Sequence, residues 1–280
     1  MALSLQSESR IVTSTMHQDK EIINNKKDKI MTEKEMYNLI NGQGNTGNGF
    51  AYDERSRGLS NTLSALMRKV YVWMTLALVI TGVTAYGVAS SPTLLTKIYT
   101  SSGLMWGLII AEFVLVFAIS GAINRLSLST ATLLFILYSV VNGATLSAIF
   151  AFYSSTVITK VFLITAGTFG AMAFYGYTTK KDLSSMGKIL FMALLGLIIA
   201  TVVNIFLKSA GFDYILSYIG VAIFTGLTAW DTQKIKQMLQ TQYDMSEGAQ
   251  KLALLGALTL YLDFINLFLY LLKIFGNNRD

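Results

Sequence analysis

The chain has 280 residues, of which 53% are hydrophobic and only 14% carry a charged side chain. Soluble domains are roughly a quarter charged, so this composition excludes an ordinary soluble enzyme or nucleic-acid-binding module. The apolar residues form runs near the roughly 20 residues that cross a bilayer as a helix. They lack the alternation of a membrane β-barrel strand. We therefore expect an all-α, polytopic membrane protein.

The sequence contains no cysteine and a single histidine, His17. Disulfides, thiolate metal sites, cysteine nucleophiles and zinc sites built from several histidines are therefore excluded. The net charge of +6 fits basic residues retained in cytosolic loops better than a nucleic-acid surface. We expect no bound cofactor and no nucleic-acid partner.

Residues 1–60 are polar and include the runs NNKKDK and NGQGNTGNGF. They hold too few large apolar residues to form a core, so we expect a largely disordered tail. No apolar segment follows their charges as it does in a secretory signal. Residues 61–280 are expected to form one seven-helix transmembrane domain.

Seven apolar segments follow the tail, and short connections join them. Short connections make consecutive helices antiparallel neighbours. The expected segments are Val70–Ser90, Gly103–Ile123, Leu128–Tyr153, Val157–Thr178, Ile189–Lys208, Tyr214–Trp230 with an amphipathic continuation, and Ala249–Phe275.

Basic residues predict the orientation of these segments, because the side richer in Lys and Arg stays in the cytosol. The side of the N-terminal tail carries nine outside the tail itself: Arg68, Lys69, Arg125, Lys180, Lys181, Lys188, Lys234, Lys236 and Lys251. The other side carries five: Lys97, Lys160, Lys208, Lys273 and Arg279. We expect a multi-pass protein of the inner (plasma) membrane with a cytosolic N-terminus and an external C-terminus.

Three carboxylates fall inside apolar segments: Glu112, Asp231 and Asp263. A charge at mid-bilayer costs a few kcal/mol, so each is a candidate functional residue. Glu112 should face the interior of the bundle, where it could hold a hard cation together with the side-chain oxygen of Asn142 or Asn204. A structural hydrogen bond is an equal alternative for Glu112.

The numbering relates the two aspartates to each other. Asp231 lies 12 residues before the polar link Tyr243–Gln250, and Asp263 lies 13 residues after it. In an antiparallel hairpin both lie at matched depth, about 18 Å from the tip. Two facing carboxylates in a poor dielectric cannot both ionise cheaply, so we expect them to share a proton.

Such a pair can act as a proton sensor, a metal site for a hard cation or an acid–base dyad. Two structural alternatives stay open at this point. Asp231 could face solvent beside Lys234 at the membrane end, and Asp263 could bond a neighbouring helix.

Five stretches of the chain resemble the Bax inhibitor motif (transmembrane Bax inhibitor-like) family, and in particular its bacterial members. They are MRKVYVWMTLALVITGVTAY in the first segment, AEF in the second, TTKKDLSSMGK after the fourth, TAWDTQKIK after the sixth and LYLDFINLFLYLLKIFG in the seventh. The likeness covers about residues 60–277 and leaves the tail outside.

The resemblance implies six helices around a central apolar seventh. It also implies a pH-sensitive calcium leak, gated by aspartates that match Asp231 and Asp263. The family's acidic residue of the second helix matches Glu112. A basic residue near the cytosolic end of that helix would be Arg125, although its spacing from Glu112 departs from the family pattern. Bacterial members are linked to a membrane-anchored AAA protease, and eukaryotic members to suppression of cell death.

Two other classes of protein share features with this sequence. An intramembrane aspartyl protease also needs two aspartates on adjacent helices, but its Gly-x-Gly-Asp and Pro-Ala-Leu motifs are missing, and Pro92 is the only proline. We therefore expect no enzyme. A non-conducting regulator that binds a membrane protease or another partner stays open.

Overall fold

The computed structural model describes the backbone of residues 46–276 and the side chains of residues 58–276. The polar tail predicted over 1–60 lies, up to residue 45, outside the described residues. Residues from Gly58 onward belong to one compact unit, and the account that follows concerns that unit.

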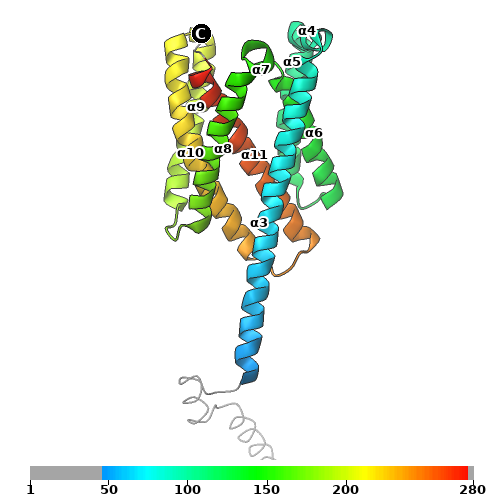
Figure 1. Ribbon diagram of the computed structural model, residues 1–280, viewed down its shortest axis with the longest axis vertical. Coiled ribbons are helices and arrows are strands. Elements are labelled where there is room, and N and C mark those ends of the chain that lie inside the picture. The colour runs from blue at the N-terminus through cyan, green and yellow to red at the C-terminus, as the bar shows by residue number, and fades with distance from the viewer. Residues whose placement is uncertain (1–45, 277–280) are drawn as a thin grey trace, which may run out of the picture. The chain divides into compact units, whose positions relative to one another are not determined.

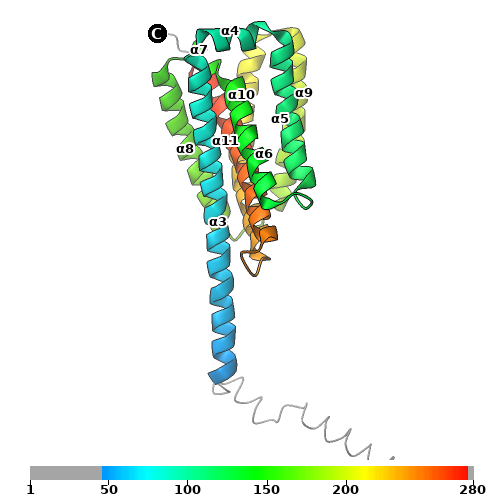
Figure 2. The same cartoon turned by 90° about the vertical axis from the view of Figure 1, so that its right-hand side faces the viewer.

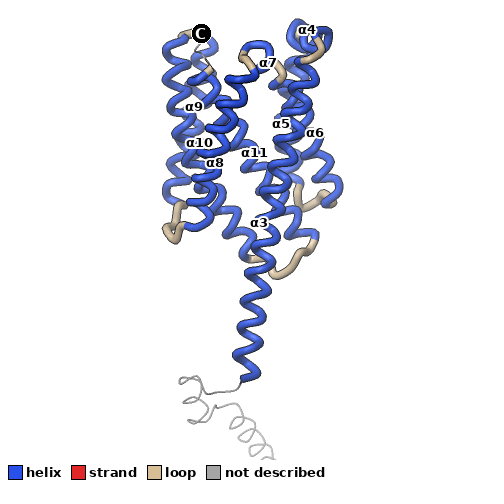
Figure 3. The backbone as a smooth tube through the Cα atoms, in the orientation of Figure 1, coloured by secondary structure: helices blue, strands red, loops and turns tan. Residues whose placement is uncertain are grey.

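Seven helices in the described part of the chain are long and apolar enough to cross a membrane. They are α3 (Thr46–Ala89), α5 (Ser102–Ala122), α6 (Leu128–Leu146) continued by α7 (Ile149–Phe152), α8 (Ser155–Thr178), α9 (Ser184–Leu207), α10 (Ala210–Gln240) and α11 (Glu247–Phe275). A short helix, α4 (Pro92–Thr100), links α3 to α5 (Figure 2). Short loops make the other connections (Figure 3). The predicted all-α polytopic fold is confirmed.

Serine residues start most of these helices. Ser91, Ser127, Ser154, Ser209 and Ser246 each accept a hydrogen bond from a backbone N–H in the first turn of α4, α6, α8, α10 and α11 respectively. Such caps satisfy N–H groups that a helix cannot bond internally. The only proline of the chain, Pro92, opens α4, where its missing N–H costs nothing.

Helix α11 is the central element of the bundle. In an apolar 18-residue stretch of α11, 67% of the residues are buried, against 33% or less in the corresponding stretches of the other spanning helices. It packs on α6, α8 and α10 and passes between the group α8–α9–α10 and the group α3–α5–α6 (Figure 1). The outer helices α5 and α9 make their main contacts with α6 and α10. The central seventh helix implied by the family resemblance is therefore present.

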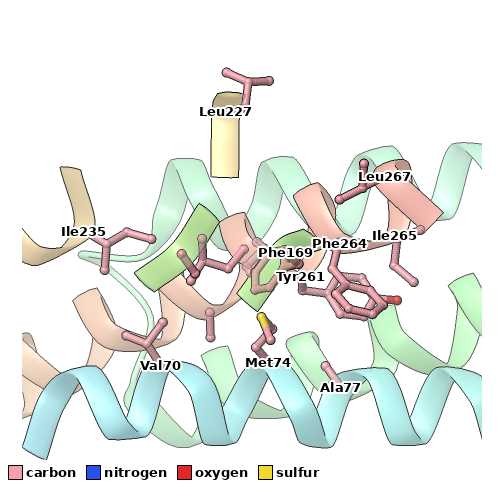
Figure 4. Close-up of a cluster of buried hydrophobic side chains, with 14 of the residues drawn as sticks. Val70, Met74, Ala77, Phe169, Leu227, Ile235, Tyr261, Phe264, Ile265 and Leu267 are labelled. Carbon is pink, nitrogen blue, oxygen red and sulfur yellow. The ribbon is translucent and has the colours of Figure 1, made fainter. Parts of the chain in front are cut away.

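Apolar and aromatic side chains fill the space around α11 (Figure 4). Tyr261 is fully buried and meets Phe135 and Tyr138 edge-on, with ring centroids 5.9 and 5.7 Å away. On α8, Phe169 meets Phe264 at 5.4 Å. Such pairs stabilise packing by about 0.5–1.5 kcal/mol beyond the area that they bury.

The third predicted segment, Leu128–Tyr153, is interrupted rather than continuous. The Tyr99 hydroxyl donates to the carbonyl of Thr145 (2.5 Å) and accepts from the backbone N–H of Ala148 (3.0 Å). A side chain inserted into the helical ladder takes up backbone groups that would otherwise bond within the helix. Helix α6 therefore ends at Leu146, and the short α7 follows.

One end of the bundle carries the connections 123–127, 179–183 and 241–246. The Lys69 side chain of α3 donates to Gln250 at the start of α11, so this part of α3 also lies there. We call it the basic end, because it holds most of the lysines and arginines counted above.

Candidate functional site: a buried aspartate pair

The structure brings Asp231 and Asp263 together where α10 packs on α11. Both line one cavity of about 470 Å³, and their carboxyl groups lie within hydrogen-bonding reach of each other. Phe224 stacks on Tyr270 at 5.9 Å on one side of the pair. On the other side, Ile235 packs closely against Gly256. These contacts fix the antiparallel register that sets the two aspartates face to face.

Burial decides between the alternatives for Asp231. It is 8% exposed, and Asp263 is 5% exposed. The alternative in which Asp231 faces solvent at a helix end is therefore wrong. The reason is that α10 continues nine residues beyond Asp231 to Gln240, which keeps the carboxyl group inside the hairpin. Lys234 also lines the cavity, with its ammonium 4.9 Å from the ring centroid of Trp230.

The cavity offers oxygen atoms from neutral side chains beside the two carboxyl groups. Thr259 and Asn266 line it together with the pair. One oxygen of Asp263, Oδ2, is buried without a hydrogen-bond partner among the described residues. Buried polar atoms in native proteins almost always have a partner, and oxygen ligands are those that Ca²⁺ takes.

Within the described part of the chain, these oxygens do not belong to a metal site with three or more ionisable ligands. The described residues contain no group of three or more His, Cys, Asp or Glu side chains that could hold a metal ion. The cavity around the pair thus offers two carboxyl groups and neutral oxygens, and the cationic Lys234 lines it as well.

One residue that the sequence pattern did not single out anchors a loop beside this pair. Gln233 lies two positions after Asp231 and is buried. Its oxygen accepts from the backbone N–H of Leu183 (2.8 Å), and its amide nitrogen donates to the carbonyl of Lys181 (2.7 Å). The connection 179–183 is thus tied to α10. Both partners fall in family-like stretches, but no spacing rule relates them.

Glu112 lies in a second polar cluster, on another side of α11. Its side chain contacts Asn142 and Thr145 of α6, and its Oε1 atom is buried without a hydrogen-bond partner in the described part of the chain. Asn142 accepts from the hydroxyl of Tyr261 (3.0 Å), which also bonds Thr81 of α3 (2.7 Å). A polar chain therefore connects Glu112 to α11.

This cluster and the aspartate pair are separate sites. Tyr261 and Asp263 are two residues apart in one helix, so their side chains leave α11 in roughly opposite directions. Helix α11 therefore carries one carboxylate-bearing polar site on each of two faces.

Two other predicted residues are not part of either site. Arg125 is exposed in the connection between α5 and α6, and about 15 Å of helix separates Glu112 from Ala122, the last residue of α5. The structure does not bring Arg125 and Glu112 together. Asn204 accepts from the backbone N–H of Ser209 (3.2 Å) at the end of α9, so it caps a helix and is not a neighbour of Glu112.

The comparison with known proteins shows the family of this chain. Residues 63–280 match the family model described as "Inhibitor of apoptosis-promoting Bax1". The chain belongs to this Bax inhibitor-like family. The resemblance read from the five stretches is thus confirmed, and the family is one of membrane proteins and not a known enzyme family.

Bacterial relatives of this family match most of the chain. The inner membrane protein YbhL of Escherichia coli (strain K12) is 49% identical over 219 residues, which cover 78% of this chain and 93% of the relative. An uncharacterized protein of Borreliella burgdorferi is 47% identical over 214 residues, 76% of this chain and 92% of its own length. An uncharacterized membrane protein of Streptococcus pyogenes serotype M6 is 43% identical over 176 residues, 62% and 75% of the two chains. The chain is therefore a multi-pass membrane protein of this bacterial type.

Proposed function

We propose that this Bax inhibitor-like protein is a pH-sensitive cation leak pathway, with Ca²⁺ as the transported ion and the Asp231–Asp263 pair as its gate. The observation that carries the proposal is the pair itself. Two carboxyl groups face each other inside a membrane-spanning bundle and line a cavity of about 470 Å³. An intramembrane carboxylate marks an ion or proton path by default.

The proposed gate follows from the electrostatics of two close carboxyl groups. With one shared proton, a hydrogen bond holds α10 against α11. With both groups ionised, two like charges repel across a gap of poor dielectric, where Coulomb energies far exceed those in water. The protonation state of the pair would therefore set the separation of the two helices, and with it the opening of the path.

Glu112 would serve this path as a separate cation site. Its buried, unpartnered Oε1 atom and the side-chain oxygens of Asn142 and Thr145 supply ligands suited to a hard cation. The adjacent break between α6 and α7 supports this role, because discontinuous helices accompany ion sites in transporters. Arg125, exposed at the basic end, would act only on ions arriving there.

The proposal includes a location and an orientation. The basic end would face the cytosol of a cell whose inner membrane holds the protein, because basic residues favour that side. A membrane-anchored AAA protease is the proposed protein partner, and the basic end is the surface that a cytosolic domain of such a partner would meet.

Calcium flux into proteoliposomes, with the purified protein as their only protein, tests the function. We expect Ca²⁺ entry that depends on the protein and changes between about pH 6 and pH 8. The same vesicles containing the double variant Asp231→Asn/Asp263→Asn should lose the pH dependence. Flux no greater than in protein-free vesicles would reject the leak pathway. It would favour the non-conducting regulator, which co-purification with the protease would then test.

A further inference from the structure

A groove between α3 and α8 lies outside both carboxylate sites. It has a volume of about 440 Å³ and is lined mainly by apolar side chains, among them Met67, Met74, Phe169 and Phe174. Gly170 forms part of its wall, and a Cβ atom built on this glycine would meet nothing within 4 Å. The groove is therefore open along α8, on a surface that a spanning bundle turns toward lipid.

The charged side chain that lines this groove lies at one of its ends. Arg68 lines it, is exposed and lies at the basic end, where α3 enters its apolar run. The ion pairs within the described part of the chain join other residues. Tyr177, near the end of α8, lines the same end and carries the ammonium of Lys236 at 4.8 Å from its ring centroid. Arg68 is thus the cationic side chain that lines the groove, while the Lys236 ammonium donates to the backbone carbonyl of Tyr177 (2.7 Å).

The groove is long enough to reach from the headgroup level of a membrane lipid to its acyl chains. From Arg68 to Met74 α3 rises about 9 Å, and from Tyr177 to Phe169 α8 spans about 12 Å. Tyrosine side chains such as Tyr71 and Tyr177 favour the membrane–water interface. The cationic mouth is then at headgroup level, and the apolar part reaches into the hydrocarbon.

We propose that this groove binds one anionic phospholipid, with the phosphate on Arg68 and an acyl chain along Met74, Phe169 and Gly170. Arginine suits this task because its planar guanidinium bonds phosphate oxygens in pairs. Basic pockets between spanning helices on the cytosolic side are a recurring setting for anionic headgroups. One residue connects the groove to the neighbourhood of the aspartate pair. Tyr71 lines the groove and lies beside Thr232, the residue that follows Asp231.

Native mass spectrometry of the purified full-length protein in detergent tests this site. The probes are phosphatidylglycerol and phosphatidylcholine of identical acyl chains, added at equal concentrations. We expect a saturable single adduct that forms preferentially with phosphatidylglycerol. Arg68→Gln should weaken that adduct about fivefold and leave the phosphatidylcholine signal unchanged. Gly170→Leu fills the groove and should abolish the saturable adduct with either lipid.

Matched controls come from the same chain. Arg125→Gln removes an exposed basic residue at the same end, and Gly196→Leu fills an open glycine position on α9. Both should bind phosphatidylglycerol like the unchanged protein. Equal binding of the two lipids, an equal loss in Arg68→Gln and Arg125→Gln, or an unchanged adduct in Gly170→Leu would each overturn the proposal. The measurement needs no ion flux, so it is independent of the proposed leak.

Discussion

At the scale of single residues, three carboxyl groups within the spanning helices differ in burial: the two aspartates are buried, and Glu112 is half-buried. Asp231, Asp263 and Glu112 all lie in apolar helices, yet the aspartates and Glu112 have polar neighbours of different kinds. The two aspartates have each other, and Glu112 has an amide and a hydroxyl. These differences predict that the residues respond differently to removal of their charge.

The aspartate pair should behave as one titrating unit. Asp231→Asn and Asp263→Asn each remove one ionisable group while keeping the shape of the side chain, so each should flatten or shift the pH dependence of calcium flux in proteoliposomes. The double variant should add little to the stronger single variant, because residues in contact are not additive. Asp213→Asn, at an exposed ion pair with Lys273, serves as the control. An unchanged pH profile in both single variants would contradict the sensor role.

Glu112 should affect conduction rather than pH sensing. Glu112→Gln keeps the contacts with Asn142 and Thr145 but removes the charge that attracts a cation, so we expect lower calcium flux or selectivity at an unchanged pH midpoint. Flux measured across a pH series checks this, with Glu247→Gln at an exposed helix start as the control. Normal flux with a lowered melting temperature would identify Glu112 as a structural hydrogen-bond acceptor instead.

At the scale of helices, close backbone approach fixes how α8, α9 and α10 pack. A Cβ atom on Gly176 of α8 would clash with the backbone carbonyl of Ala229, and one on Gly187 of α9 would clash with the ring of Trp230. Both neighbours directly precede Asp231 on α10. The position of the aspartate pair therefore depends on glycines of two other helices.

Gly176→Ala should destabilise the protein by about 1–3 kcal/mol, the usual cost of overpacking. The backbone of Ala229 cannot rotate away as a side chain can, so α8 and α10 must separate. Thermal unfolding in detergent, followed by circular dichroism or by loss of the monodisperse peak, measures the effect. Gly167→Ala on the same helix, where a Cβ atom meets nothing within 4 Å, should change stability little. Equal melting temperatures for the two variants would refute the close approach.

The bond between Gln233 and the connection 179–183 gives a prediction for a loop. Gln233→Ala removes the partner of the Leu183 N–H and of the Lys181 carbonyl, so this segment should open more often. We expect faster trypsin cleavage after Lys180 or Lys181 in the detergent-solubilised protein. Gln242→Ala, in the exposed connection after α10, is the control. Equal cleavage rates in the two variants would show that Gln233 does not hold the loop.

The sequence predicted the helices and the aspartate pair better than the contacts between distant segments. Apolar runs and hairpin numbering depend on neighbours along the chain, so they led to seven spans and to Asp231 facing Asp263. The break after α6 depends on Tyr99, 46 residues before the carbonyl that it bonds. The hydrogen bond between Gln233 and Leu183 similarly joins residues that are 50 positions apart. Such contacts follow from packing in three dimensions, which periodicity does not encode.

At the scale of the whole molecule, the central position of α11 links the two polar sites. One face of α11 meets α10 at the aspartate pair, and another meets α3 and α6 through Tyr261. A shift of α11 against α10 would therefore reach the Glu112 cluster through Asn142. This arrangement gives the proposed gate and the proposed cation site a common moving part.

The direction of such a path across the membrane depends on topology, which reporter fusions test. Seven spanning helices place the two ends of the chain on opposite sides, and the basic residues favour the N-terminal side nine to five. A reporter fused at residue 60 should read as cytosolic, and one fused at Asp280 as external. Two ends on one side would mean that one helix does not cross fully, with α10 or α11 as the first to examine. If the reporter at residue 60 reads as external and the one at Asp280 as cytosolic, the aspartate pair, Arg68 and the cationic end of the groove face the external side. The proposed cytosolic gate would then be wrong.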